Sequence, residues 1–356
     1  MSHQKLLTKL EGFRSRNSQN HCYINKDVYR LLYDRDFYYI AYNNIKSNDG
    51  AETVGSDGTS LHGFCEEWVD ELISSFRDES YQPHPNRITY IPKKNGKMRK
   101  LSFPNGKDKL VQECVRIILE CIYEPTFSNL SHGFRPNRSI HSALAQVYTW
   151  NSTVWFIEGF DEIDHRILES ILRERIQDER FIRLINKLLK AGYFDMEHKF
   201  QPTKLGNAQG SCTSPILANI YLDKLDRFME DIIERDTMGK YRKQNPEYAR
   251  LRYQLNKAIS VHDIKEIQRL RKELKSTSAV DNFDPNFRRI HYVRYADDFL
   301  VGTISSKAYA EQLKQELKQF LDEVLHLRSS EEKTVITHAK NEKAHFLGYL
   351  INRRFP

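Results

Sequence analysis

The amino-acid sequence predicts an α+β fold, because helical and strand patterns follow one another without the regular β-α-β order of a parallel sheet. Residues 108–123 and 309–324 place apolar side chains three and four positions apart, which is typical of amphipathic helices. Residues 88–103 alternate apolar and polar side chains around a Lys-Asn-Gly turn, which indicates a β-hairpin. With 356 residues, 39% of them hydrophobic, the chain can bury the core of one large or two medium domains.

The same patterns place the other elements in order. A short helix is expected over residues 27–33, and a Gly/Ser/Asp-rich loop at residues 50–58 precedes an amphipathic helix over residues 61–78. Residues 291–303 alternate like two strands that meet at a turn over an Asp-Asp pair. A buried strand at residues 154–157, helices over residues 166–176 and 181–189, and a last strand at residues 345–351 complete the pattern.

The composition argues against several classes of protein. The five cysteines are odd in number and form no Cys-x-x-Cys pair, which predicts reduced thiols rather than a disulfide framework or a zinc site. The sequence lacks the run of about 20 apolar residues that a membrane span needs. Because the N-terminal residues lack the apolar core of a signal peptide, we expect a protein of the bacterial cytoplasm or of an organelle matrix that is not secreted.

The positive charge of the chain is concentrated in residues 235–289. This segment holds 14 Lys and Arg against 7 Asp and Glu, so its excess equals the net charge of +7 for the whole chain. A basic excess in one segment indicates a polyanionic partner more strongly than a uniform excess does. The alternatives are a solvated helical surface and a contact in a homodimer.

The basic segment is predicted to form a helical hairpin. Asn245 and Pro246 suit the N-cap and the first position of one helix, and Ser260 with Asp263 resembles a capping box that opens the second. Apolar residues at helical spacing would form the seam between the helices: Leu251, Leu255, Ile259, Ile264, Ile267, Leu270 and Leu274. The outward faces are then left to basic residues: Arg250, Lys257, Lys265, Arg269, Arg271, Lys272 and Lys275.

The adjacent carboxylates of Asp297 and Asp298 carry the clearest chemical signal. Two acids at a tight turn between apolar strand halves are costly unless a cation neutralises them, and hard oxygen ligands select Mg²⁺, with Mn²⁺ as an alternative. Two such ions about 3.5–4 Å apart are the usual device for in-line phosphoryl transfer. Alternatively, the Asp-Asp pair is simply a polar hairpin turn.

The motif Tyr295-Ala296-Asp297-Asp298, within VRYADDFLVG, resembles the palm motif of reverse transcriptases, particularly those encoded by group II introns. Further blocks resemble this family in the same order along the chain: GAETVGSDG, IPKKNGKMRKLSFP, SHGFRPNRS, GNAQGSCTSPILANIYLDKLD, EEKT and FLGY. The resemblance extends from about residue 28 to residue 351. It implies the fingers and palm of a right-hand polymerase, in which the palm has a ferredoxin-like antiparallel sheet with helices.

The resemblance also implies a function. It predicts an RNA-directed DNA polymerase that uses Mg²⁺ and dNTPs to copy an RNA template from a DNA primer. It also predicts a maturase, which binds the group II intron RNA and promotes its splicing. The alternative is an RNA-binding splicing cofactor without polymerase activity.

The roles of single residues come from matching positions in the family. Asp297 and Asp298 would be the catalytic metal ligands. The incoming dNTP would be bound by Lys93, Arg99, Phe160 and Gln209, the last of these with Gly210 beside the nascent base pair. Arg135 and Arg138 would contact template phosphates or instead connect fingers and palm internally, and Arg269, Arg271, Lys272 and Lys275 would bind RNA.

One departure concerns the first palm motif, in which the family continues Glu-Gly-Asp-Ile-Lys. Here Glu158-Gly159 is followed by Phe160, which aligns with the aromatic residue that screens out a 2′-hydroxyl, so the family's third metal-binding carboxylate is absent. Because both ions depend on that carboxylate, we expect a very poor polymerase unless Glu158 or Asp161 replaces it. A natural loss, an engineered deletion and an incomplete sequence are all compatible with the gap.

The predicted domains follow from these matches. Family members continue past the FLGY block into a thumb and C-terminal domains, which we expect this chain to lack. Residues 1–60 are expected to form an N-terminal extension and loop, residues 61–150 the fingers, residues 151–234 the first part of the palm, residues 235–289 the basic insertion, and residues 290–356 the second part of the palm.

Overall fold

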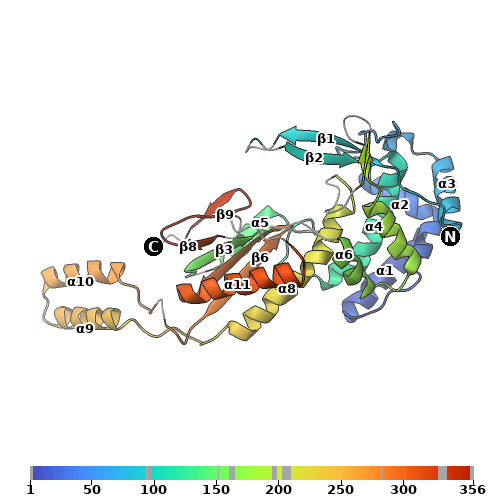
Figure 1. The fold of residues 1–356 in the computed structure, drawn as a ribbon. Helices are drawn as coiled ribbons and strands as arrows, with labels where there is room; N and C mark the ends of the chain where they lie inside the picture. Colours follow the sequence, from blue (N-terminus) through green and yellow to red (C-terminus); the bar gives the residue numbers. More distant parts are fainter. Residues whose placement is uncertain are drawn as a thin grey trace. The chain divides into compact units, whose positions relative to one another are not determined.

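The computed structural model describes residues 3–92, 96, 98–150, 152–159, 165–194, 199–202, 210–281, 284–327 and 335–352. The chain forms two compact units and passes between them more than once (Figure 1). The first unit comprises Met1–Ser139, Glu162–Lys224 and Leu325–Leu327, and the second comprises Ile140–Asp161, Leu225–Val324 and Arg328–Pro356. The consecutive domains predicted from the sequence cut across these units, because Glu162–Lys224 groups with the N-terminal part of the chain.

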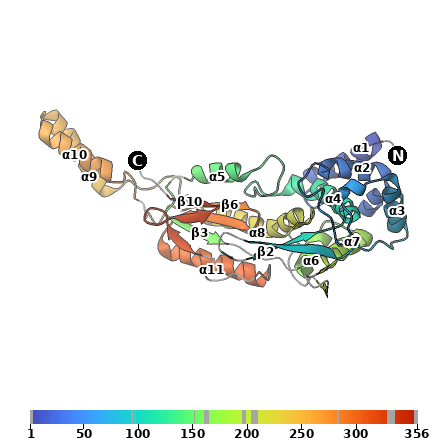
Figure 2. The ribbon, with the colours of Figure 1, turned by 90° about the horizontal axis from the view of Figure 1, so that it is seen from above.

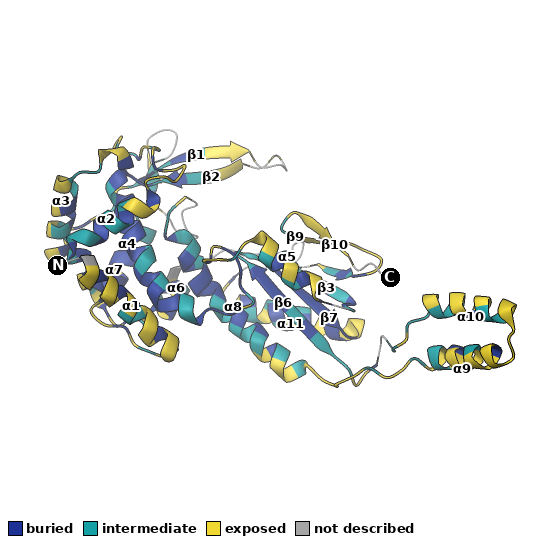
Figure 3. Ribbon diagram, turned by 180° about the vertical axis from the view of Figure 1, so that it is seen from behind, coloured by how far each residue is buried: buried dark blue, intermediate teal, exposed yellow. Residues whose placement is uncertain are grey.

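The first unit is built around α4 (Gly106–Tyr123), most of whose residues are buried (Figure 3). Asn105 caps this helix, because its side chain accepts a hydrogen bond from the amide of Asp108. α1 (His3–Gln19) and α2 (Arg35–Ile45) pack against α4. The unit also contains α3 (Glu66–Arg77), α6 (His165–Arg173), α7 (Glu179–Leu189) and the 3-10 helices η1 (Val28–Tyr33), η2 (Leu61–Gly63) and η3 (Glu124–Thr126).

A four-stranded sheet in the order β2-β1-β4-β5 belongs to the same unit. β1 (Asn86–Pro92) and β2 (Met98–Phe103) pair antiparallel and confirm the predicted hairpin. β4 (Tyr193–Phe194) pairs parallel with β1, and β5 (Phe200–Gln201) pairs antiparallel with β4.

The second unit contains the sheet that carries the Asp297–Asp298 turn. Its spatial order is β6 (Arg289–Tyr295), β7 (Asp298–Ile304), β3 (Trp155–Gly159) and β8 (Ile336–His338), and all neighbouring strands are antiparallel. Along the chain, α8 (Ser214–Asp236) lies between β3 and β6, and α11 (Lys307–Glu323) lies between β7 and β8. This β-α-β-β-α-β order is ferredoxin-like, so the predicted α+β class and palm sheet are confirmed.

Helices cover both faces of this sheet (Figure 2). α5 (Ile140–Tyr148) packs against β6 on one face, where Val147, Trp150 and Phe156 share a buried cluster. α11 contacts β3 on the other face. The second half of α8 packs against α11 through the stacked rings of Phe228 and Phe320, with centroids 4.0 Å apart.

The basic segment forms the predicted helical hairpin from α9 (Pro246–Ser260) and α10 (Ile264–Ser276). Asn245 caps α9, as predicted. The predicted cap of the second helix is wrong, because Ser260 lies inside α9 and the Asp263 side chain accepts the amide hydrogen of Glu266 instead. Antiparallel bridges between residues 238 and 288 and between residues 244 and 280 join the segments that lead into and out of the hairpin.

The buried seam of the hairpin is shorter than predicted. Leu251, Ala258 and Leu270 form its core, and Leu255, Ile267 and Leu274 pack partly buried against them. Ile259 and Ile264 are 44% and 69% exposed, because they lie where the helices end and turn.

The C-terminal segment also differs from the prediction of one strand over residues 345–351. It forms an antiparallel pair, β9 (Ala344–Phe346) and β10 (Tyr349–Ile351). Leu347 and Gly348 make the turn with φ of 54° and 81°, and two successive left-handed residues are typical of a two-residue hairpin loop. Among the described residues, none of the helices is long and apolar enough to span a membrane.

Candidate active site

The Asp297–Asp298 motif lies at the tight turn between β6 and β7. Tyr295 pairs with Asp298, so Ala296 and Asp297 are the two turn residues, and Asp298 is the first residue of β7 rather than part of the turn as predicted. Ala296 has φ of 56°, a conformation in which glycine is normally found at the first loop position. A left-handed non-glycine residue costs about 1–3 kcal/mol, and such strain gathers at functional sites.

The environment of the turn disfavours a charge on Asp298. Burial, and after it the negative charge of Asp297, raises the pKa of the Asp298 carboxyl to about 6. A bound divalent cation would counter both causes of the raised pKa. It would neutralise the negative charges of the two aspartates, and its bond to the Asp298 carboxylate would replace the water that burial excludes.

A buried ion pair is hydrogen-bonded to the main chain of the turn. Arg294 and Asp226, on β6 and α8, both have fully buried side chains. Nε and Nη2 of Arg294 donate to the two Asp226 carboxylate oxygens at 2.8 and 2.6 Å, and Nη1 donates to the Ala296 carbonyl at 2.6 Å. The Tyr292 hydroxyl donates to the same carboxylate at 2.8 Å. Removing one partner of such a pair costs about 3–5 kcal/mol, because the other charge is left buried and unpaired.

Arg294, Asp226 and Tyr292 are not among the site residues expected from the sequence. The available signals were a charged residue among the apolar and aromatic residues that end β6, at Arg294, and an acid on the apolar side of a helix, at Asp226. Such charges are rarely buried unless they are paired, so each could have been marked as a buried group that needs a partner.

The neighbouring strand β3 ends beside the turn. Its last residue, Gly159, pairs with Phe299, which directly follows Asp298. Phe160 and Asp161 lie outside the described residues. Glu158 is half-buried, burial raises the pKa of its carboxyl, and the carboxylate accepts a hydrogen bond from the Thr337 hydroxyl. In the described part of the chain, no group of three or more His, Cys, Asp and Glu side chains could hold a metal ion, so Glu158 does not join the aspartate pair.

Comparison with known proteins agrees with this geometry. The family model described as reverse transcriptase (RNA-dependent DNA polymerase) matches residues 91–249 and 258–351. The chain belongs to the reverse transcriptase family.

Curated relatives place it among reverse transcriptases of group II introns. The group II intron-encoded protein LtrA of Lactococcus lactis subsp. cremoris is 40% identical over 97% of this chain and 60% of its own length. An uncharacterized 91 kDa protein in the cob intron of Schizosaccharomyces pombe is 38% identical over 97% of this chain and 44% of its own length. The chain thus spans about 60% of LtrA. These matches do not favour the alternative of an RNA-binding splicing cofactor without polymerase activity.

Two further matches involve a bacterial protein and a telomerase structure. Protein YkfC of Escherichia coli is 36% identical, over 86% of this chain and 78% of its own length. Among solved structures, apo telomerase from Candida tropicalis covers 76% of this chain and 47% of its own length, at 13% identity and a TM-score of 0.42.

The residues predicted to bind the incoming dNTP are only partly described. Lys93, Phe160 and Gln209 lie outside the described residues. Arg99 is exposed on β2, opposite Ile91, and belongs to the first unit, whereas the aspartate pair belongs to the second. Gly210 has φ of 116°, and a Cβ atom there would lie 2.3 Å from the Ser102 carbonyl, so this glycine allows close packing on β2.

The two arginines of the FRPNRS block have different environments. Arg135 is buried, and its guanidinium donates to the Glu124 carboxylate and to the carbonyls of Ser128 and Ser131. These contacts lie within the first unit and favour a structural role for Arg135 over phosphate contact. Arg138 is partly exposed and donates to the Asn129 carbonyl and side chain at 2.7 and 2.8 Å. Template contact by Arg138 stays a prediction.

The four basic residues proposed to bind RNA all lie exposed on α10. Arg269 is paired along the helix with Glu266 and Glu273, so part of its charge is already neutralised. Arg271, Lys272 and Lys275 present their charges from the same helix.

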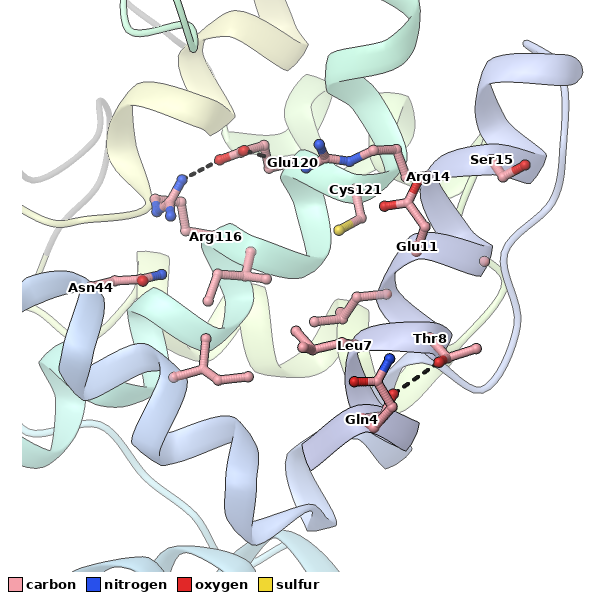
Figure 4. A pocket seen from close by; sticks show the side chains of 14 residues that line it. Gln4, Leu7, Thr8, Glu11, Arg14, Ser15, Asn44, Arg116, Glu120 and Cys121 are labelled. Carbon is pink, nitrogen blue, oxygen red and sulfur yellow. Dashed lines mark hydrogen bonds and ion pairs between the residues drawn. The ribbon is translucent and has the colours of Figure 1, made fainter. Parts of the chain in front are cut away.

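The first unit contains a cavity of about 670 Å³ between α1, α2 and α4 (Figure 4). Its lining includes the apolar residues Leu7 and Ile117 as well as charged groups that contact one another. Glu120 pairs with both Arg14 and Arg116. None of the residues predicted for polymerase chemistry lines this cavity.

Proposed function

We propose that this chain is the polymerase part of a group II intron reverse transcriptase, which copies RNA into DNA at the Asp297–Asp298 turn. The observation that carries the proposal is the aspartate pair itself. It directly follows the left-handed residue Ala296 at a turn of a ferredoxin-like sheet, and its second carboxyl has a pKa raised to about 6. Strain and an unfavourable charge at one turn are expected where a protein prepares a site for a ligand.

The side chains fit Mg²⁺ or Mn²⁺, because two adjacent carboxylates offer hard oxygen ligands. When bound there, such an ion would neutralise the charge that develops on the transferred phosphoryl group. The chain's own contribution is to hold Asp297 and Asp298 at the tight turn where β6 and β7 pair. Arg99 and Lys93 would hold the incoming triphosphate by charge and hydrogen bonds, and Gln209 and Phe160 would contact its nucleoside.

The missing carboxylate lowers the expected rate. The family places an Asp directly after the Gly that corresponds to Gly159, and in this chain Phe160 follows instead. Since Gly159 pairs with the residue after Asp298, the family's Asp would come next to the aspartate pair. We therefore propose that RNA binding is retained while DNA synthesis by this exact sequence is very slow.

We also propose that the chain binds the group II intron RNA and assists its splicing, with the α9–α10 hairpin as one contact. The exposed Arg271, Lys272 and Lys275 suit phosphate contacts. A location in the bacterial cytoplasm or an organelle matrix fits this role. A hairpin that serves only as a solvated surface or a homodimer contact would leave RNA affinity independent of these residues.

Primer extension on an RNA template tests the catalytic proposal. Insertion of Asp-Ile-Lys-Gly-Gly between Gly159 and Phe160 should raise template-dependent dNTP incorporation by roughly 10²–10³-fold, the scale of one electrostatic catalytic group. A matched insertion of Ala-Ile-Lys-Gly-Gly should not. Equal activity of the two variants would contradict the assignment of that position as the third carboxylate.

A further inference from the structure

The buried pair of Arg294 and Asp226 makes a third contact that stability alone does not require. Two charges with no exposed surface are expensive to bury, and apolar residues often replace such pairs without loss of stability. The third guanidinium nitrogen, Nη1, donates to the carbonyl of Ala296 at 2.6 Å. Ala296 is the residue with φ of 56°, and its carbonyl carbon is bonded to the amide nitrogen of Asp297.

We infer that Arg294, held by Asp226, is a positioning residue that fixes the Asp297–Asp298 turn in its metal-binding conformation. The inference rests on the proposed metal-binding role of that turn. Arg294 donates to the main chain of the turn through Nη1. It acts through the main chain of Ala296, and α8 supplies the fixed point.

Only a guanidinium fits this arrangement. Its planar fork places Nε and Nη2 on the two oxygens of Asp226, which leaves Nη1 in one direction, toward Ala296. A lysine ammonium keeps the charge but cannot span the carboxylate and the carbonyl in the same fixed geometry. The main chain of a left-handed alanine relaxes toward other conformations unless its surroundings hold it.

Tyr292 provides a matched control. Its hydroxyl donates to the same Asp226 carboxylate, and Tyr292 is as deeply buried as Arg294, but among the described residues no hydrogen bond joins this hydroxyl to the turn. Tyr292→Phe therefore weakens the buried network without releasing Ala296. Any variant that acts only by destabilising the sheet should behave like Tyr292→Phe.

The test compares Arg294→Lys, Asp226→Asn and Tyr292→Phe in the full chain. Hydrogen exchange is followed by mass spectrometry in peptides that cover the β6–β7 turn and, as a reference, α11. Mn²⁺ binding is followed by electron paramagnetic resonance of the free ion. We expect exchange at the turn to accelerate roughly tenfold or more in Arg294→Lys relative to Tyr292→Phe, with equal exchange in α11. The Mn²⁺ dissociation constant should rise about 10-fold or more.

If Arg294→Lys does not fold, Asp226→Asn tests whether Arg294 holds the turn. This variant keeps the shape of the Asp226 side chain and removes only the negative charge that fixes the guanidinium of Arg294. Faster turn exchange in Asp226→Asn than in Tyr292→Phe supports the inference. Turn exchange equal to that of Tyr292→Phe, in whichever of the two variants folds, overturns it. If the unchanged chain binds no Mn²⁺, the proposed metal site fails, whereas the exchange comparison still decides whether Arg294 holds the turn.

Discussion

Gly159 pairs with Phe299 in the antiparallel register of β3 and β7, so the end of β3 lies one residue away from Asp298 along the paired strand. The family's third carboxylate would follow directly after Gly159. The nearest acid before it on the same strand, Glu158, accepts a hydrogen bond from the Thr337 hydroxyl. The position of the gap, next to the aspartate pair, makes its catalytic consequence testable.

Glu158→Gln should leave any residual primer extension unchanged within about twofold, because the Glu158 carboxylate is engaged away from the aspartate pair. Asp161→Asn is the companion variant, because Asp161 is the other acid that could replace the missing carboxylate. Asp161 lies outside the described residues. Both are measured as template-dependent dNTP incorporation with Mn²⁺. A loss of activity in Glu158→Gln alone would show that Glu158 moves in as a substitute ligand.

The raised pKa of Asp298 predicts how stability depends on pH. Because the folded-state pKa is about 6, above its ordinary value of 3.8, the folded state holds the proton more tightly than the unfolded state. The stability contributed by the protonated form is complete below pH 4 and is lost as the pH rises through 6. Asp298→Asn should therefore stabilise the protein at pH 8 by about 1–2 kcal/mol, after allowance for partial exposure.

Thermal unfolding at pH 4 and pH 8, with and without Mg²⁺, measures this effect. The gain in Asp298→Asn should be present at pH 8 and small at pH 4. Mg²⁺ should raise the melting temperature of the unchanged chain at pH 8 and leave that of Asp298→Asn almost unaffected. Equal melting temperatures for the two proteins at pH 8 would contradict the environment assigned to Asp298.

The α9–α10 hairpin predicts a change in the salt dependence of RNA binding. Replacing Arg271, Lys272 and Lys275 with Gln should flatten the log–log salt slope by about 2 units if all three residues contact phosphate. Adding Arg269→Gln should change the slope further by less than one full contact, because Arg269 is paired with Glu266 and Glu273. These exposed substitutions should each change stability by no more than about 0.5 kcal/mol.

Filter binding to folded intron RNA over a salt series gives the slope. The control carries the same charge change on exposed lysines of the first unit: Lys5→Gln, Lys9→Gln and Lys190→Gln. If the control and the hairpin variant flatten the slope equally, the effect is one of net charge and the hairpin is not a specific contact.

Local patterns in the sequence were sufficient to predict much of the fold. Alternation in residues 291–303 predicted the β6–β7 hairpin, because each strand has a buried face. The turn was misplaced by one residue, since pairing of Tyr295 with Asp298 is decided by hydrogen bonds rather than by side-chain pattern. Likewise, the FLGY block was interpreted as continuous strand, although Leu347 and Gly348 both adopt left-handed conformations.

Long-range pairing accounts for what the sequence could not predict. Arg294 and Asp226 are 68 residues apart, and nothing local in either segment identifies the other as its partner. The long helix α8 was not predicted either, because polar residues such as Asn219 and Asp226 interrupt its apolar pattern where they are buried by tertiary contacts. The aspartate pair was recognised in advance because both acids are adjacent in the chain.

The most direct test of the account is primer extension by the double variant Asp297→Ala, Asp298→Ala. It is made in the chain that carries the Asp-Ile-Lys-Gly-Gly insertion, where the signal is expected to be strong, and is compared with Asp322→Ala, Glu323→Ala. The control removes an adjacent, exposed pair of carboxylates from the end of α11 in the same unit. We expect no templated incorporation by the first variant, unchanged incorporation by the control, and RNA affinity within about twofold in both. Full extension by the Asp297→Ala, Asp298→Ala variant would contradict the assignment of this turn as the polymerase metal centre.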